Sequence, residues 1–307
     1  MMARFLARRL ILAFVVVFAV ASLTFFALNL SGDPISNALS DAGASEEQIA
    51  AVRHQMGYDR PIIVRYADFI FSAGRGDFGR SIFYGEETLP LVVARFPYTM
   101  ILAGVAMLIT VLVAIPLGIL AATFPDSLLD RTIVTLAALG QSVPIFVVGP
   151  ILILIFSVHL AILPVSGAES LWSVVLPAVT LSFYPMARIT RLLRASMLEV
   201  TGSEYVLTAR ARGFSEFRVV LRYISNNALL PVLTVLGLQL GNLLGGAVIV
   251  ETVFAWPGIG SLTRDALINS DFPLAQAAVI VIAIAVVVVN FLTDVVYALV
   301  DPRIRLS

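Results

Sequence analysis

The chain has 307 residues, of which 59% are hydrophobic and 13% charged, and its formal net charge is zero. Soluble globular proteins are nearer half apolar and a quarter charged, so this composition indicates that lipid is the solvent for much of the chain. The sequence contains no cysteine, which excludes disulfides and thiolate metal sites, and all 20 basic residues are arginine. The lack of lysine excludes a Walker A phosphate loop, and the zero net charge gives no indication of nucleic-acid binding.

Six segments are long and apolar enough to cross a membrane as helices, which requires about 20 residues each. They run over residues 10–30, 100–122, 133–158, 171–188, 229–250 and 274–300. The first could be a signal peptide, but its uncharged stretch is longer than the usual apolar region of about 7–15 residues. The fourth is the weakest, because Pro177 and Pro185 interrupt it. The sequence therefore predicts an all-α membrane protein with six transmembrane helices.

The charge distribution predicts the orientation of these helices. If the N-terminus is cytoplasmic and the segments alternate, the cytoplasmic parts hold thirteen arginines and six acids, and the outer parts hold seven arginines and thirteen acids, Glu251 among them. This bias follows the positive-inside rule, so both termini are expected in the cytoplasm. The resulting parts are a first helix over 1–30, an outer loop over 31–96, a five-helix core over 97–300 and a tail over 301–307. The core includes a long cytoplasmic loop over 188–227.

The outer loop is too long for a simple hairpin and carries helix signals. Ser45 can cap a short helix that Gly57 ends, and Pro61 can begin a second helix with Tyr66 and Phe69 on one face. The segment is interpreted as a lid on the outer membrane face, as a docking surface for a soluble partner, or as both.

The cytoplasmic loop carries seven arginines and the pattern of a helix pair. Thr201 and Glu204 fit a capping box for the first helix. Gly213 is expected to break it, and Ser215 can cap the second helix. Gly213→Asp is therefore expected to abolish function while leaving the protein inserted.

The composition around this break favours contact with another surface. Small residues such as Ala209 allow close approach, and Arg210 and Arg212 can reach outward to carboxylates. The alternative is that the arginines bind anionic lipid headgroups.

Few polar residues lie inside the predicted spans, and such residues are functional candidates. Asp294 is interpreted as a structural ion pair, with Arg188 as one possible partner, or as a helix cap, in preference to a proton relay. Gln141, Asn242 and Asn290 could line a path for a polar solute or hydrogen-bond between helices. The choice stays open for Gln141, whereas packing is favoured for the two asparagines.

Three glycines on the fifth span, Gly237, Gly241 and Gly245, lie four residues apart. This spacing lets another helix approach closely, either within the subunit or from a partner.

Several segments resemble one family of membrane proteins. The segment 204–213, together with 227–231, resembles the EAA loop of ABC-transporter permeases, and is most similar to the dipeptide/oligopeptide/nickel branch. The segments 4–10, 32–34, 76–81, 163–167, 251–260 and 301–305 resemble the same branch, in the same order. The superfamily's Glu-Ala-Ala falls on 207–209, where only Ala209 matches, and the gap from Gly213 to Pro231 is longer than in the general motif.

The resemblance implies a type I ABC importer fold and the role of a permease subunit, without catalytic residues, metal or cofactor of its own. Such a subunit pairs in the bacterial or archaeal inner membrane with a second homologous permease, two ATPase subunits that bind ATP and Mg, and an outer substrate-binding protein. It moves its solute by alternating access. The coupling residues that the resemblance implies are Glu204, Thr208, Ala209, Arg210, Arg212 and Gly213. Peptides are the commonest cargo of the branch, but nickel, opine, sugar and glutathione systems look alike at this level.

Two other classes fit the sequence less well. For a serine hydrolase, the bases available to Ser142 are His54 in the outer loop and His159, which lies about 25 Å away along a helix, beyond hydrogen-bond reach. An ion-coupled carrier would show repeated halves and charges at the membrane midplane, and neither is evident.

Overall fold

A computed structural model describes residues 2–30, 32, 33, 36, 45–55 and 57–300. Throughout this part of the chain the secondary structure is helical, apart from an isolated bridge between Arg80 and Glu87, which confirms the all-α prediction. The long helices are α1 (Met2–Leu30), α5 (Thr88–Thr123), α6 (Leu128–Ser142), α8 (Val175–Thr201), α11 (Ser225–Val253) and α13 (Phe272–Val300). The shorter ones are α3 (Glu46–Gln55), α4 (Ile62–Ala73), α7 (Ile145–Leu152), η1 (Ile153–His159), η2 (Leu171–Val174), α9 (Glu204–Ala211), α10 (Glu216–Arg218), η3 (Val219–Ile224) and α12 (Ile259–Ile268).

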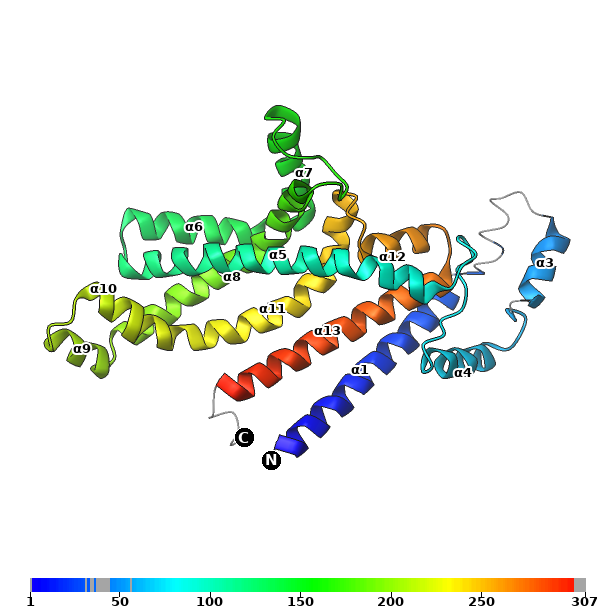
Figure 1. Cartoon of the computed structure of the whole chain (residues 1–307), viewed down its shortest axis with the longest axis horizontal. Helices are drawn as coiled ribbons and strands as arrows, with labels where there is room; N and C mark the ends of the chain where they lie inside the picture. Colours follow the sequence, from blue (N-terminus) through cyan, green and yellow to red (C-terminus); the bar gives the residue numbers. More distant parts are fainter. Residues whose placement is uncertain (1, 31, 34–35, 37–44, 56, 301–307) are drawn as a thin grey trace.

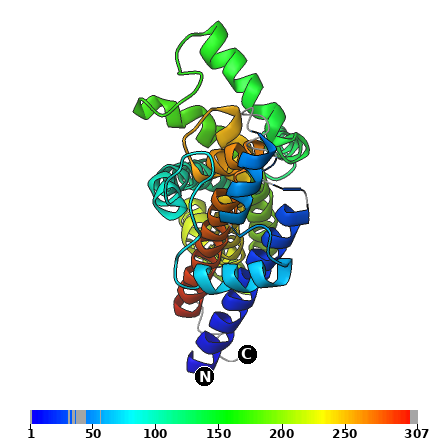
Figure 2. The ribbon, with the colours of Figure 1, turned by 90° about the vertical axis from the view of Figure 1, so that its right-hand side faces the viewer.

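The long helices form an elongated bundle. Figure 1 shows α5 and α8 crossing at its centre, with α9 and α10 at one end and α12 at the other. Both views show α7 projecting away from the bundle (Figures 1 and 2). The two loop regions identified in the sequence therefore lie at opposite ends of the molecule, with α3 and α4 far from α9 (Figure 1).

Four helical stretches are long and apolar enough to span a membrane, over residues 7–30, 88–123, 216–253 and 272–295. A fifth is obtained if α6 and the following helix Ile145–His159 count as one span, although they are bent by 108°. The third predicted span, over 133–158, is thus broken at Val143 and Pro144. The expected fourth span forms α8, which continues to Thr201 and carries three arginines.

Close helix packing holds the bundle core together. At the crossing of α5 and α8, a Cβ added to Gly118 would lie 2.9 Å from the Cβ of Leu193, a fully buried side chain. Small residues allow such approach, and close van der Waals packing is the main attraction between helices in lipid.

The outer loop forms the two predicted helices. Ser45 and Gln48 make reciprocal capping bonds at the start of α3, from the Ser45 N–H to Gln48 Oε1 at 2.9 Å and from the Gln48 N–H to Ser45 Oγ at 3.4 Å. The helix α4 follows Pro61, and Tyr66 and Phe69 pack on Phe25 with ring centroids 5.4 and 5.3 Å apart. The loop between α1 and α5 is therefore fastened to the C-terminal end of α1.

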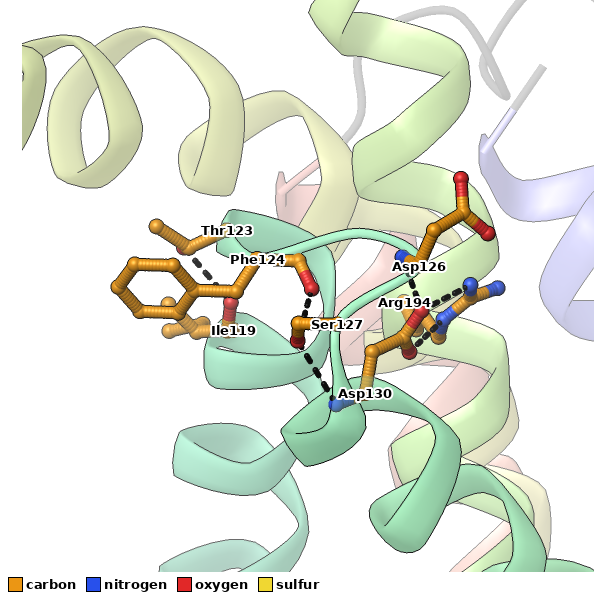
Figure 3. Close-up of polar contacts among 7 residues, drawn as sticks. All are labelled: Ile119, Thr123, Phe124, Asp126, Ser127, Asp130 and Arg194. Atoms are coloured by element: carbon orange, nitrogen blue, oxygen red, sulfur yellow. Dashed lines mark hydrogen bonds and ion pairs between the residues drawn. The ribbon is translucent and has the colours of Figure 1, made fainter.

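The turn between α5 and α6 is pinned to α8 (Figure 3). Ser127 caps α6 by accepting a hydrogen bond from the Asp130 N–H. The buried Asp130 carboxylate accepts one bond from the Asp126 N–H at 2.9 Å and two from Arg194 at 2.5 and 2.6 Å. This ion pair fastens α8 to the first turn of α6.

A second buried carboxylate joins α5, α11 and α12. Glu251 is fully buried and accepts hydrogen bonds from Thr99 Oγ1 at 2.6 Å and from the Ser261 N–H at 3.0 Å. A side chain on Gly258 would collide with this carboxylate, and one on Gly260 would lie 2.7 Å from it. Glu251, counted with the segment that follows the fifth predicted span, lies within α11, which continues to Val253, and the chain then folds back over the carboxylate.

Asp294 of α13 forms an ion pair with Arg9 of α1 at 2.8 Å. The expected ion pair is confirmed, but the suggested partner Arg188 is wrong, because α1 and not α8 lies beside this part of α13 (Figure 1).

Candidate coupling loop and polar pocket

The loop between α8 and α11, predicted to be cytoplasmic, begins where α8 ends. The helix α9 starts at Glu204 with Ser203 at its N-cap. The predicted capping box from Thr201 is wrong, because Thr201 still belongs to α8 and its hydroxyl donates to the Met197 carbonyl.

Gly213 ends α9 as predicted. Its φ angle is +76°, a left-handed conformation that side chains with a Cβ rarely adopt, and no other atom would lie within 4 Å of a Cβ placed there. Ser215 occupies the N-cap of α10 as predicted, although its side chain makes no capping bond. The helix continues through η3 into α11, so the loop is directly joined to a spanning helix.

Arg210 closes the loop on itself. It donates to the two oxygens of Glu216 at 2.5 and 3.1 Å, and this pairing raises the pKa of the Arg210 guanidinium above its usual value. Ala209 and Val206 are buried and face the rest of the chain. Within this subunit, Arg210 and Ala209 therefore hold the loop in shape.

The tip of the loop presents apolar side chains to its surroundings. Tyr205, Leu207 and Phe217 are 43%, 55% and 77% exposed. Around them lie the exposed residues Glu204, Thr208, Arg212 and Gly213. We call this set of seven residues the loop surface.

A pocket of about 540 Å³ lies where the break between α6 and α7 meets α8 and α11. Most of its lining is apolar, and we call it the polar pocket after its six polar side chains, Gln141, Ser142, Tyr184, Arg188, Gln239 and Asn242. The structure therefore brings together two of the three polar residues predicted for a solute path, Gln141 and Asn242.

Asn290 lies elsewhere, on α13 against Gly241. A Cβ on Gly241 would be 2.7 Å from Asn290 Oδ1, and a Cβ on Gly237 would collide with Thr293. Two of the three predicted packing glycines thus face a helix of the same subunit. Gly245 is exposed, with no atom within 4 Å of a Cβ placed there.

The sequence analysis predicted Arg188 and Arg191 to lie in the cytoplasmic loop. It did not predict that Arg188 lines this pocket or that Arg191 bonds to Gln141. Together with Tyr184 they form a stripe at positions i, i+4 and i+7 of α8, and all three are exposed. This spacing puts the residues on one helix face, so the sequence pattern could have predicted a polar face on this helix.

Two family models match the chain. The model described as "binding-protein-dependent transport system inner membrane component" matches residues 114–306, and its N-terminal companion matches residues 2–103.

Individual proteins match over nearly the full length. The dipeptide transport system permease protein DppB of Escherichia coli K12 is 38% identical, covering 99% of both chains. The oligopeptide transport system permease protein AppB of Bacillus subtilis is 35% identical, covering 99% of this chain and all of that one. Among solved structures, the inward-facing MetNI methionine ABC transporter superposes with a TM-score of 0.60 at 20% identity, over 70% of this chain and 98% of that one.

Proposed function

The chain belongs to the family of binding-protein-dependent transport system inner membrane components, and on that basis we propose that it imports di- and oligopeptides as one half of an ATP-driven pore. The chain is a multi-pass membrane subunit, and ATP hydrolysis resides on separate subunits in such systems. The peptide cargo is supported by the full-length relatives, which are named as dipeptide and oligopeptide permeases. The observation that carries the proposal is this full-length similarity.

The loop surface is proposed as the docking site for an ATPase subunit. It lies at one end of the molecule (Figure 1), beyond the ends of α5 and α6. Exposed apolar groups such as Leu207 and Phe217 are expected to mark a protein contact, because they gather at a tip among polar residues. Since α10 continues into α11, movement of the ATPase would be transmitted directly to a spanning helix.

A second, homologous permease is proposed to complete the pore, and a binding protein to deliver the solute at the opposite end. With α8 counted as a crossing and α6–η1 as a broken one, the chain makes six crossings with both termini in the cytoplasm. The arginine bias of the sequence supports this orientation. The arginines on one face of α8 indicate that a partner subunit or water lies beside that face, because contact between a charge and lipid is unfavourable.

The test begins with purification of the tagged chain in mild detergent and identification of the proteins that accompany it. Recovery of a second permease and two ATPases is expected. The complex, reconstituted in vesicles with its binding protein, is then expected to take up a labelled dipeptide when ATP is supplied on the cytoplasmic side. Recovery of the chain alone, with uptake that needs no ATP, would exclude the proposed function.

A further inference from the structure

Three arginines of α8 lie at successive turns but have different surroundings. Arg194 donates two hydrogen bonds to the buried Asp130, as described above. Among the residues that the structure describes, Arg188 and Arg191 form no ion pair with a carboxylate. The helix therefore holds one arginine that fastens the fold and two that are available to another anion.

The two available arginines lie farther along α8 from the α5–α6 turn than the paired one. Arg188 precedes Arg194 by six residues, which is about 9 Å along a helix, in the direction away from the α5–α6 turn. Its neighbour Ala187 lies 3.2 Å from the position of a Cβ on Gly140, so Arg188 is level with the end of α6. A charged side chain at this level of a membrane bundle is expected to face water or protein, because exposure of a charge to lipid is costly.

The pocket beside these arginines is rich in hydrogen-bond donors. The side-chain oxygen of Gln141 already accepts a bond from Arg191 at 2.7 Å, and that of Gln239 accepts one from Asn242 at 2.7 Å. The side-chain NH2 groups of both glutamines remain able to donate to a solute, beside the acceptor oxygen of Asn242. The guanidinium of Arg188 shares the lining of the pocket with these groups.

We propose that Arg188, which lines this pocket, and Arg191, which bonds to Gln141 at its edge, bind the free carboxylate of the transported solute, so that the permease itself favours peptides with an ionised C-terminus. Guanidinium groups bind carboxylates through paired, charge-assisted hydrogen bonds, which makes arginine well suited to this task. This inference rests on the proposed function, since it assumes that the pocket lies on the path of a peptide.

The first test compares uptake of dialanine and of dialanine amide by the reconstituted complex, with binding protein saturated by each peptide. The binding protein is the same in all assays, so a change in the acid-to-amide uptake ratio reports on the permease. Arg188→Gln and Arg191→Gln are each expected to lower this ratio on the order of tenfold, the effect of losing a charge-assisted hydrogen bond. Arg188→Lys, which keeps the charge, should restore part of it.

Arg194→Gln is the matched control, because Arg194 lies on the same helix but pairs with Asp130. It is expected to lower both uptake rates alike. The inference is overturned if Arg188→Gln leaves the ratio unchanged, or if Arg194→Gln shifts it equally. Failure of the unmodified complex to take up either peptide would instead count against the proposed function.

A second measurement needs no peptide. The chain contains no cysteine, so Arg188→Cys introduces a single thiol into it. In the complex, an anionic methanethiosulfonate is expected to react with this thiol faster than a cationic one, because Arg191 remains nearby. Adding Arg191→Gln should abolish the preference. A thiol that reacts with neither reagent, with or without ATP, or that prefers the cationic reagent, would contradict the proposal.

Discussion

At the scale of single residues, Gly213 has a conformational reason to be glycine. The sequence suggested that a partner's close approach requires a small residue there. The structure adds a φ of +76° in open space, which already disfavours other residues within the isolated subunit. Asparagine tolerates this conformation far better than β-branched residues do.

The two explanations make different predictions for Gly213→Val and Gly213→Asn. If the backbone angle decides, the valine variant should lose nearly all ATP-dependent uptake while the asparagine variant keeps most of it. Uptake is measured in membrane vesicles at matched protein levels. Equal loss in both variants would show that contact with another surface is what excludes a side chain.

Asp130 is the residue whose loss should weaken the fold most directly. Asp130→Asn removes the charge that faces Arg194 at 2.5 Å and should lower stability on the order of 2–3 kcal/mol. This lies below the range of 3–5 kcal/mol for a fully buried pair, because Arg194 is one-quarter exposed. Thermal unfolding in detergent, followed by circular dichroism, measures the change. Asp126→Asn is the control, since only the backbone of Asp126 bonds to Asp130, and an equal effect there would contradict the assignment.

At the scale of elements, the glycines of α11 have two kinds of surroundings. Gly241 packs against α13 of the same subunit, whereas Gly245 faces open space. Gly241→Ala should lower the unfolding temperature, because the added methyl meets Asn290 and overpacking of this kind costs about 1–3 kcal/mol. Gly245→Ala should leave the isolated subunit as stable or slightly more stable, since alanine favours helix and the space is open. If Gly245→Ala instead reduces recovery of the second permease, then this part of α11 forms the interface between the two permeases. A lower unfolding temperature for Gly245→Ala in the isolated chain would contradict the open-space assignment.

Elements set by local signals could be predicted from the sequence, and those set by distant contacts could not. The capping of α3 by Ser45 and the end of α9 at Gly213 depend on neighbouring residues, and both are confirmed. The start of α9 was placed too early, because α8 is supported through Thr201 by packing along its buried face. The ion-pair partner of Asp294 depends on which helix lies beside α13, and no local pattern encodes that.

Of the two candidate sites, one could be predicted from a local sequence pattern and the other could not. The loop surface was recognisable, because its resemblance lies in one continuous segment. The polar pocket collects residues from the α6–α7 break, α8 and α11, and the single sequence gave no means of pairing Gln141 with Arg191 across the fold. Glu251 was counted by its position after an apolar stretch, whereas its burial depends on Thr99 and the backbone of α12.

At the scale of the whole molecule, the proposed orientation can be tested because the chain lacks cysteine. Ser45→Cys in the outer loop and Ser215→Cys in the cytoplasmic loop introduce thiols at opposite ends of the molecule. In intact cells, a membrane-impermeant maleimide should label the first and not the second. Opening the cells should allow labelling of both. Labelling of Ser215→Cys in intact cells would reverse the orientation and place the loop surface out of reach of an ATPase.

The packing of α1 also has a consequence for biosynthesis. The helix lies against α13 and is fastened to α4 at its C-terminal end, so a span that is synthesised early has one synthesised much later as its principal neighbour. Until α13 has been synthesised, α1 lies in the bilayer without the helix against which it finally packs. The contact between the two helices therefore forms late. A chain that stalls before α13 leaves the contact surface of α1 exposed to the cell's quality control.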